Sequence, residues 1–207
     1  MITSKSLFHS NIVVLFQEQN FVAPDNSAFG SLYGGDAAKG ARFFDDPLMQ
    51  IKELALPAMN LKISLEKQRL RIEDLAANEP QSSILVQETL NICQKLFPQT
   101  ALAGFGFNFD LFFRFNTLLP IKDAFARFFG NEPIQNADLR DFGFQFTLDR
   151  GNGNFDIYFL KVTSPLELAA HLNRHFNEQK LPPKEKLQKM LENCYNDVDK
   201  VVGQLKF

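Results

Sequence analysis

Residues 101–116 read ALAGFGFNFDLFFRFN, and this stretch limits how the rest of the chain can be arranged. Large apolar side chains occupy every second position, at Phe105, Phe107, Phe109, Leu111, Phe113 and Phe115. The positions between them are Gly104, Gly106, Asn108, Asp110, Phe112 and Arg114. Successive side chains of a β-strand point to opposite faces, whereas a helix would scatter these rings around its circumference. The stretch therefore predicts a strand of an antiparallel sheet that has one buried face.

Other segments share this strand-like alternation. Residues 11–22 predict a first strand. Within residues 60–74 the apolar residues change from odd-numbered to even-numbered positions, which predicts a hairpin or one bulged strand. The clearest hairpin covers 141–162, with a turn at Arg150-Gly-Asn-Gly153, because Gly and Asn tolerate positive φ. Its apolar face is expected to contain Phe142, Phe144, Phe146 and Leu148 on one strand, and Phe155, Ile157 and Phe159 on the other.

Helical signals follow each group of strands. A helix is expected at about 82–97, with Ser82 or Ser83 as its cap, and a short one between Pro120 and Gly130. The run Ser164-Pro-Leu-Glu167 matches a capping box with proline at the first helical position, which predicts a helix to about Phe176. A last amphipathic helix is expected at about 184–205.

The resulting order of elements is typical of an α+β fold. We expect an antiparallel sheet of about five to six strands, with helices packed on one face and a two-helix C-terminal segment. Residues 1–181 would form a single domain with a long Gly-rich loop at 23–47. Residues 182–207 would pack as an amphipathic helix on this domain or on a partner.

The composition excludes several classes of function. The 207 residues carry a formal net charge of −2 and no basic block, which argues against a nucleic-acid partner. No apolar run approaches the 18 residues of a membrane span. Two cysteines, Cys93 and Cys194, make no disulfide framework and fit a reducing compartment, so we expect a cytoplasmic protein. The 23 Phe, against 3 Tyr and no Trp, indicate rings that serve mainly as core.

Candidate contact residues lie on the polar strand faces. Asp110 and Arg114, with Asp149, Asp156 and Tyr158 from the hairpin, would form either a solvated sheet face or a site for a ligand or partner. Gly104 and Gly106 weaken a strand interior, so they indicate either a bend or the close approach of another backbone or a ligand.

Two further segments are candidates for partner contact. The 23–47 loop, with Tyr33, is expected to be mobile or ordered by a partner; its Gly-rich run lacks the spacing of a phosphate-binding loop. In the last helix, Leu187, Leu191 and Val198 belong to an apolar seam that would pack on its own domain or against a second copy.

No motif for catalysis or a cofactor is present. His171 and His175 are a weak candidate metal pair, because on a helix they would share one face, but Leu172 stands where a zincin motif needs Glu. Neither cysteine nor any serine has a nucleophile pattern. We therefore expect no cofactor and lean away from an enzyme.

The first hypothesis is a non-catalytic protein-interaction or assembly module whose partner is another protein chain, foremost a second copy of itself. The alternative is a domain that binds a small apolar ligand, or an enzyme built on the same pocket, in a Phe-lined cavity beside the central sheet. In that case Asp110 or Tyr158 would be the polar anchor. A sheet whose polar face is bare favours the first hypothesis, and a pocket beside Asp110 favours the second.

Overall fold

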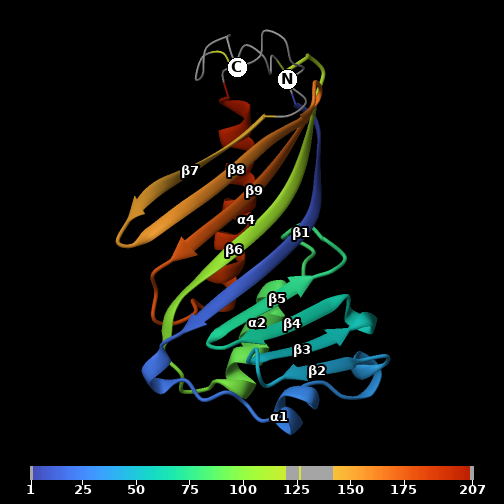
Figure 1. Ribbon diagram of the computed structural model, residues 1–207, viewed down its shortest axis with the longest axis vertical. Coiled ribbons are helices and arrows are strands. Elements are labelled where there is room, and N and C mark those ends of the chain that lie inside the picture. Colours follow the sequence, from blue (N-terminus) through green and yellow to red (C-terminus); the bar gives the residue numbers. More distant parts are fainter. Residues whose placement is uncertain (1, 120–125, 127–141, 206–207) are drawn as a thin grey trace.

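A computed structural model of the chain describes residues 2–119, 126 and 142–205. Nine strands in this part of the chain form one open antiparallel sheet, in the order β2-β3-β4-β5-β1-β6-β9-β8-β7 (Figure 1). Their bounds are β1 Ile2–Phe16, β2 Arg42–Asp46, β3 Ile51–Leu56, β4 Leu61–Glu66, β5 Arg69–Asp74, β6 Leu102–Phe115, β7 Phe142–Gly151, β8 Asn154–Ser164 and β9 Glu167–Phe176. The α-helices are α1 Asn26–Gly30, α2 Leu85–Leu96 and α4 Lys184–Gly203. Short 3-10 turns occur at Glu18–Asn20, Gly35–Ala38 and Pro57–Met59.

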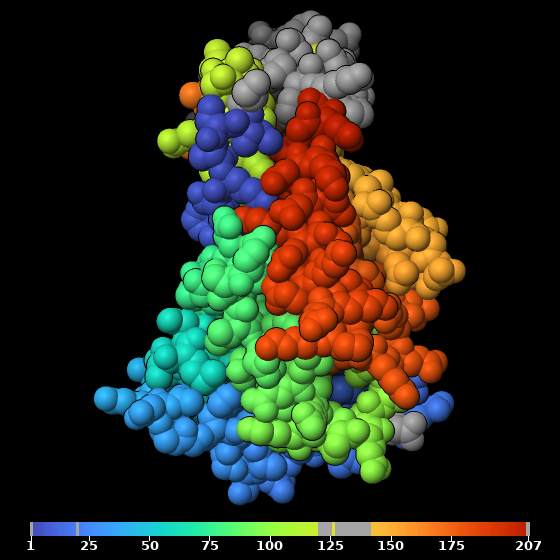
Figure 2. All heavy atoms as spheres, turned by 180° about the vertical axis from the view of Figure 1, so that it is seen from behind, coloured from blue at the N-terminus to red at the C-terminus, as the bar shows by residue number. Residues whose placement is uncertain are grey.

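The α+β class and the strand at 101–116 are confirmed. The apolar row of β6 is buried throughout, and the ring of Phe109 meets that of Tyr195 from α4 at 5.6 Å between centroids. Helices α2 and α4 lie behind the sheet in Figure 1, and Figure 2 shows them from the other side, over the strands. We call this side of the sheet the covered face, and the opposite side the open face.

The sheet has nine strands in place of the expected five to six, and the helix predicted at 164–176 was wrong. Residues 167–176 form β9, which pairs with β6 and β8. The helical interpretation used Leu168, Leu172 and Phe176, but a spacing of four is even and fits a strand equally well. The hydroxyl of Ser164 donates to the carboxylate of Glu167 at 3.2 Å inside a tight β8–β9 turn, instead of the side-chain to backbone bonds that make a capping box. The C-terminal segment therefore holds one long helix, α4.

The hairpin at 141–162 is confirmed as β7 and β8, but the apolar face of β8 was assigned to the wrong parity. A register shift between Asp149 and Gly151 inserts a residue before the turn, and Phe146 pairs with Tyr158. Tyr158, Leu160 and Val162 consequently face the core, whereas Phe155, Ile157 and Phe159 lie on the open face. A bulge of this kind reverses the side to which the following residues point.

The remaining elements agree with the sequence in part. The hairpin at 60–74 is β4 and β5, and the helices at 82–97 and 184–205 are α2 and α4. The first strand lies earlier than expected, at 2–16 rather than 11–22. The 23–47 segment holds α1 and edge strand β2, and β3 follows it. The helix predicted between Pro120 and Gly130 lies outside the described residues, apart from position 126.

Candidate functional site

The open face carries a group of aromatic and charged side chains at its centre. Strand pairing places Phe159 beside His171, His171 beside Asp110, and Asp110 beside His9, across β8, β9, β6 and β1. Phe112 follows Asp110 on the same face, and the ring of Phe8 meets it edge-on at 5.8 Å. We call these residues the open-face patch: Phe8, His9, Asp110, Phe112, Phe159 and His171.

A β-bulge in β1 explains how Phe8 reaches this patch. Leu7 pairs with Leu111 and His9 with Asp110, so Phe8 is an extra residue on β1. In a bulge two residues oppose one on the partner strand, which re-aims a side chain that would otherwise alternate to the other face. Phe8 is therefore 65% exposed, although it lies within a long central strand. Phe159, at the other side of the patch, is 42% exposed.

Asp110 holds two imidazole rings in fixed positions. Its Oδ1 is 2.6 Å from Nδ1 of His171, and its Oδ2 is 3.0 Å from Nδ1 of His9. The other ring nitrogen of His9 lies 3.4 Å from a carboxylate oxygen of Glu73, which also binds Arg71 at 2.8 Å. A carboxylate that accepts two charge-assisted bonds is well ordered, so the patch is pre-formed.

The paired charges shift the ionisation of this group. Hydrogen bonds from Asp110 and then Glu73 raise the pKa of His9 to about 9, against the opposing effect of burial. The bonds from His171 and His9 hold the pKa of Asp110 well below its usual range, and His9 likewise lowers the pKa of Glu73. At neutral pH His9 is thus a cation that donates from both nitrogens and cannot act as a general base.

We expect the stability that His9 contributes to depend on pH. Because the pKa of His9 is raised on folding, its contribution is complete below about pH 6.5, the unfolded value, and is lost as pH rises through about 9. Urea unfolding of wild type and His9→Gln should differ in free energy by about 1 kcal/mol more at pH 6 than at pH 10, a value discounted because the ion pairs are half-exposed. A difference that does not change with pH would contradict the ion pairing.

A ladder of three amides lies next to the patch. Asn173 donates to the side-chain oxygen of Asn108, and Asn108 donates to that of Asn11, both at 2.7 Å. These bonds cross β9, β6 and β1 on the open face and satisfy amides that are largely buried. The ladder supports the strands on which His9, Asp110 and His171 stand.

The two glycines of β6 are explained by close approach of a backbone. A Cβ on Gly106 would lie 2.7 Å from the carbonyl oxygen of Arg174, and one on Gly104 would meet His175 and the carbonyl oxygen of Phe176. The neighbour is β9 of the same chain, which pairs in antiparallel register with this end of β6. From the sequence, close approach of a backbone was one of two explanations for these glycines, the other being a bend in the strand.

The other predicted contact residues are placed apart from the patch. Arg114 is on the open face, where it binds Glu167 at 2.9 Å. Tyr33 donates to Glu88 of α2, and burial raises its pKa. Tyr158 is fully buried on the covered face, its hydroxyl has no hydrogen-bond partner in the described part of the chain, and burial raises its pKa to about 12. The seam residues Leu187, Leu191 and Val198 are fully buried within this chain, so a partner cannot reach them while α4 stays docked.

His171 and His175 do not form the geometry of a shared metal site. Four residues along a strand correspond to about 13 Å, and the two rings have different partners: His171 binds Asp110, whereas His175 stacks on Phe155 at 4.8 Å. No group of three His, Cys, Asp or Glu among the described residues is arranged to hold a metal ion. Within those residues His171 also has no hydrogen bond to a hydroxyl or thiol that it could activate.

Sequence reasoning placed Asp156 among solvated carboxylates, but it lies in a buried ion network on the covered face. Its two oxygens accept bonds from Arg174 at 2.6 and 2.7 Å and from Arg150 at 2.8 and 2.5 Å. Arg174 also binds Asp197 of α4 at 2.9 Å. The network therefore ties β8 and β9 to the long helix. The sequence signal for this network is that Asp156 and Arg174 are polar residues in rows of otherwise apolar residues that face the core. The signal can be read only when it is known which residues of each strand face the core.

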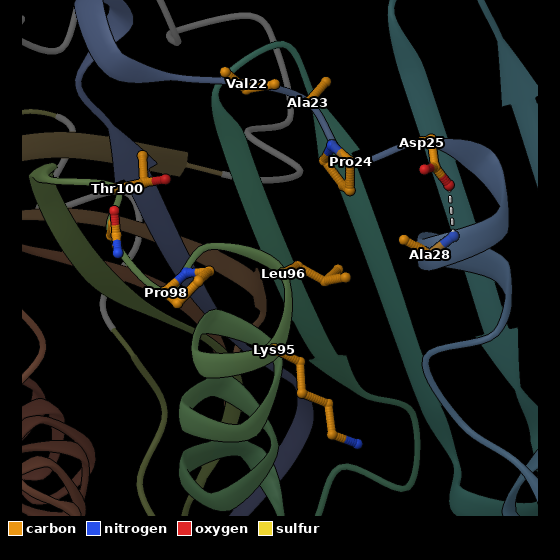
Figure 3. Close-up of a pocket in the computed structure, with 10 residues that line it drawn as sticks. Val22, Ala23, Pro24, Asp25, Ala28, Lys95, Leu96, Pro98 and Thr100 are labelled. Carbon is orange, nitrogen blue, oxygen red and sulfur yellow. Dashed lines mark hydrogen bonds between the residues drawn. The ribbon is translucent and has the colours of Figure 1, made fainter.

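A pocket of about 600 Å³ lies apart from the patch, between residues 22–28 and the C-terminal end of α2 (Figure 3). Val22, Pro24, Leu96 and Pro98 supply apolar wall, and the backbone of Ala28 donates to Asp25 at 2.7 Å beside it. Lys95 adds one positive charge. The Phe row of β6, in contrast to this pocket, is part of the hydrophobic core, and its rings are buried.

Fold and patch together define an α+β protein with an open sheet, one face covered by helices and the other carrying an ordered aromatic and charged group. No protein-family model, curated protein or solved structure matches the chain. In the described part of the chain, no helix combines the length and the apolar character that crossing a membrane requires.

Proposed function

We propose that this protein is a non-catalytic interaction module that binds a partner protein chain through the open-face patch. The observation that carries the proposal is a set of half-exposed Phe rings grouped around the carboxylate of Asp110 on a sheet face free of α2 and α4. Aromatic rings next to hydrogen-bonding groups are the side chains that contribute most at protein interfaces.

The patch is suited to recognition because little of it has to be ordered on binding. Phe8 is held by the bulge and by Phe112, and both imidazoles are held by Asp110. Pre-positioned side chains lower the entropic cost of association. The same pairing argues against acid–base catalysis, since His9 remains charged at neutral pH.

Photo-crosslinking in the cell of origin tests this proposal. Benzoylphenylalanine replaces Phe8 in one variant and Phe159 in another, because both rings are exposed and the substitute is also aromatic. We expect both variants to form an adduct with the same protein, identified by mass spectrometry. The control carries the crosslinker at Val22, which is exposed and lies beside the C-terminal end of α2 rather than on the open-face patch (Figure 3). Absence of adducts at positions 8 and 159, or the same adducts at 22, would refute the proposal.

A small apolar ligand is the second candidate, and it now rests on the pocket between residues 22–28 and α2 rather than on the Phe row. Its volume of about 600 Å³ is within the range of small-molecule sites. A native mass spectrum of the purified chain separates the two candidates. A small molecule that stays bound adds its mass to that of the monomer, whereas a separate partner protein is absent after purification and adds none.

A further inference from the structure

Edge strand β2 and the turn after it expose an unusual amount of apolar surface. Ten large hydrophobic residues are exposed in the described part of the chain, and four of them lie in this short segment: Phe43, Phe44, Leu48 and Met49. Phe44 is 54% exposed and Leu48 is 95% exposed. Exposed apolar side chains concentrated in one short segment are typical of an interaction site.

The backbone of β2 is also open to a further strand. β2 pairs with β3 on one side and ends the sheet on the other (Figure 1). None of the backbone hydrogen bonds made outside the helices and strands of the described residues involves positions 42–46. Proteins commonly protect such an edge by keeping it short and charged. β2 is short and carries Arg42, Asp45 and Asp46, but it also exposes two Phe rings.

The sequence of β2 is complementary to itself in the antiparallel direction. It reads Arg42-Phe-Phe-Asp-Asp46, and Arg42, Phe44 and Asp46 share one face because strand side chains alternate. If two copies pair about Phe44, Arg42 of each lies opposite Asp46 of the other, and the two Phe44 rings lie opposite each other. Arg42 has no ion pair within the described residues, so its charge is free for such a contact.

We propose that two copies of this chain associate through β2, in antiparallel register about a two-fold axis at Phe44, so that the two sheets become continuous. The interface is isologous, and each copy supplies both members of the two Arg42–Asp46 pairs. Opposite charges and aromatic rings placed directly across a strand pair both favour this register. The interface is separate from the open-face patch and does not depend on it.

The register also accounts for Leu48 and Met49. The turn that carries them directly follows Asp46. In the antiparallel dimer, Asp46 of one copy lies opposite Arg42 of the other. Leu48 and Met49 of one copy therefore come to lie against the segment that precedes Arg42 in the other. Phe44, Leu48 and Met49 are then covered by one contact, whereas Phe43 lies on the opposite face of the strand, where its ring meets that of Phe29 at 6.0 Å.

Light scattering on the purified full chain, across a range of concentrations, tests the proposal. Wild type should be a dimer, and Arg42→Asp should weaken dimerisation by roughly tenfold or more, because it places like charges opposite each other twice. Lys189→Asp is the matched control: it makes the same change of charge at an exposed position of α4, and it should leave the dimer unchanged. Circular dichroism establishes that each variant is folded.

The decisive experiment mixes two variants. Arg42→Asp and Asp46→Arg should each be monomeric alone, whereas their mixture should form a heterodimer, since both cross-strand pairs are then of opposite charge. Native mass spectrometry distinguishes the heterodimer by its mass. A wild type that stays monomeric, or a mixture that gives no heterodimer while both variants are folded, would overturn the proposal.

A cysteine variant covers the case in which Asp46→Arg does not fold, because Asp46 also accepts bonds from the amides of Leu48 and Met49. Directly opposite residues have Cα atoms about 4.5–5.5 Å apart, which suits a disulfide. Phe44→Cys should therefore crosslink two copies when an oxidant is added. Phe43→Cys, which lies opposite Asp45 of the other copy, should not, and equal crosslinking of both variants would refute the register.

Discussion

Replacing Phe109 with alanine is expected to lower the free energy of unfolding by about 3–5 kcal/mol. Phe109 is fully buried in the middle of the covered face, where its ring meets Tyr195 of α4. The substitution removes apolar contacts from both the sheet and the helix and leaves a cavity that neither can fill by a small shift. Urea denaturation monitored by circular dichroism measures the change.

Phe8→Ala is the matched control for this prediction. The same side chain is removed from the same sheet, but at a position on the open face that is mostly exposed. Surface substitutions usually change stability by about 0.5 kcal/mol or less, so the two variants should differ by several kcal/mol. If both variants lost a similar free energy of unfolding, Phe8 would have to be packed as Phe109 is, which would contradict an exposed position on the open face.

The second large effect is expected at Asp156. Its replacement by Asn leaves the guanidinium of Arg174 buried with Asp197 as its remaining carboxylate partner, and removes the carboxylate that also holds Arg150. Breaking a buried ion pair by removing one member costs about 3–5 kcal/mol. The lower end of this range is expected here, because Arg174 keeps its bond to Asp197 and the side chain of Arg150 is half-exposed. The free energy of unfolding should fall by this amount.

Asp36→Asn provides the comparison for Asp156. Asp36 is an exposed carboxylate in the turn at 35–38, and its neutralisation should have little effect on the free energy of unfolding. A double variant, Asp156→Leu with Arg174→Met, separates charge from packing. If the network serves mainly to pair charges, this variant should be more stable than Asp156→Asn.

The fold was predictable where the apolar pattern fitted only one of the two periods, two residues for a strand or 3.6 residues for a helix. The alternating Phe row of β6 fits only a strand, and the long pattern of α4 fits only a helix. In β9, Leu168 and Leu172 are spaced by four, which satisfies both periods, and a proline-containing capping box then favoured the wrong one. Strand β2 could not be found because five residues, two of them Phe, show no periodicity beside a Gly-rich loop.

The patch was predictable only in part, because it depends on pairing between strands distant in sequence. Asp110 and His171 were both candidates, but for different sites, since His171 had been assigned to a helix. His9 carried no signal at all, because its role comes from a strand register and a bulge that local sequence does not reveal. Tyr158 and Asp156 were misplaced by the single residue that the β7–β8 bulge adds.

The place of β1 in the sheet has a consequence for how the chain is made. β1 precedes the other described strands in the sequence, yet it lies between β5 and β6, and Ile2 pairs with Phe115. Its second neighbour is therefore synthesised about a hundred residues later, and contacts of such long separation make folding slow. Until then the apolar half of β1, including Ile12 and Val14, has only one strand beside it, so the nascent chain is exposed to aggregation during that interval.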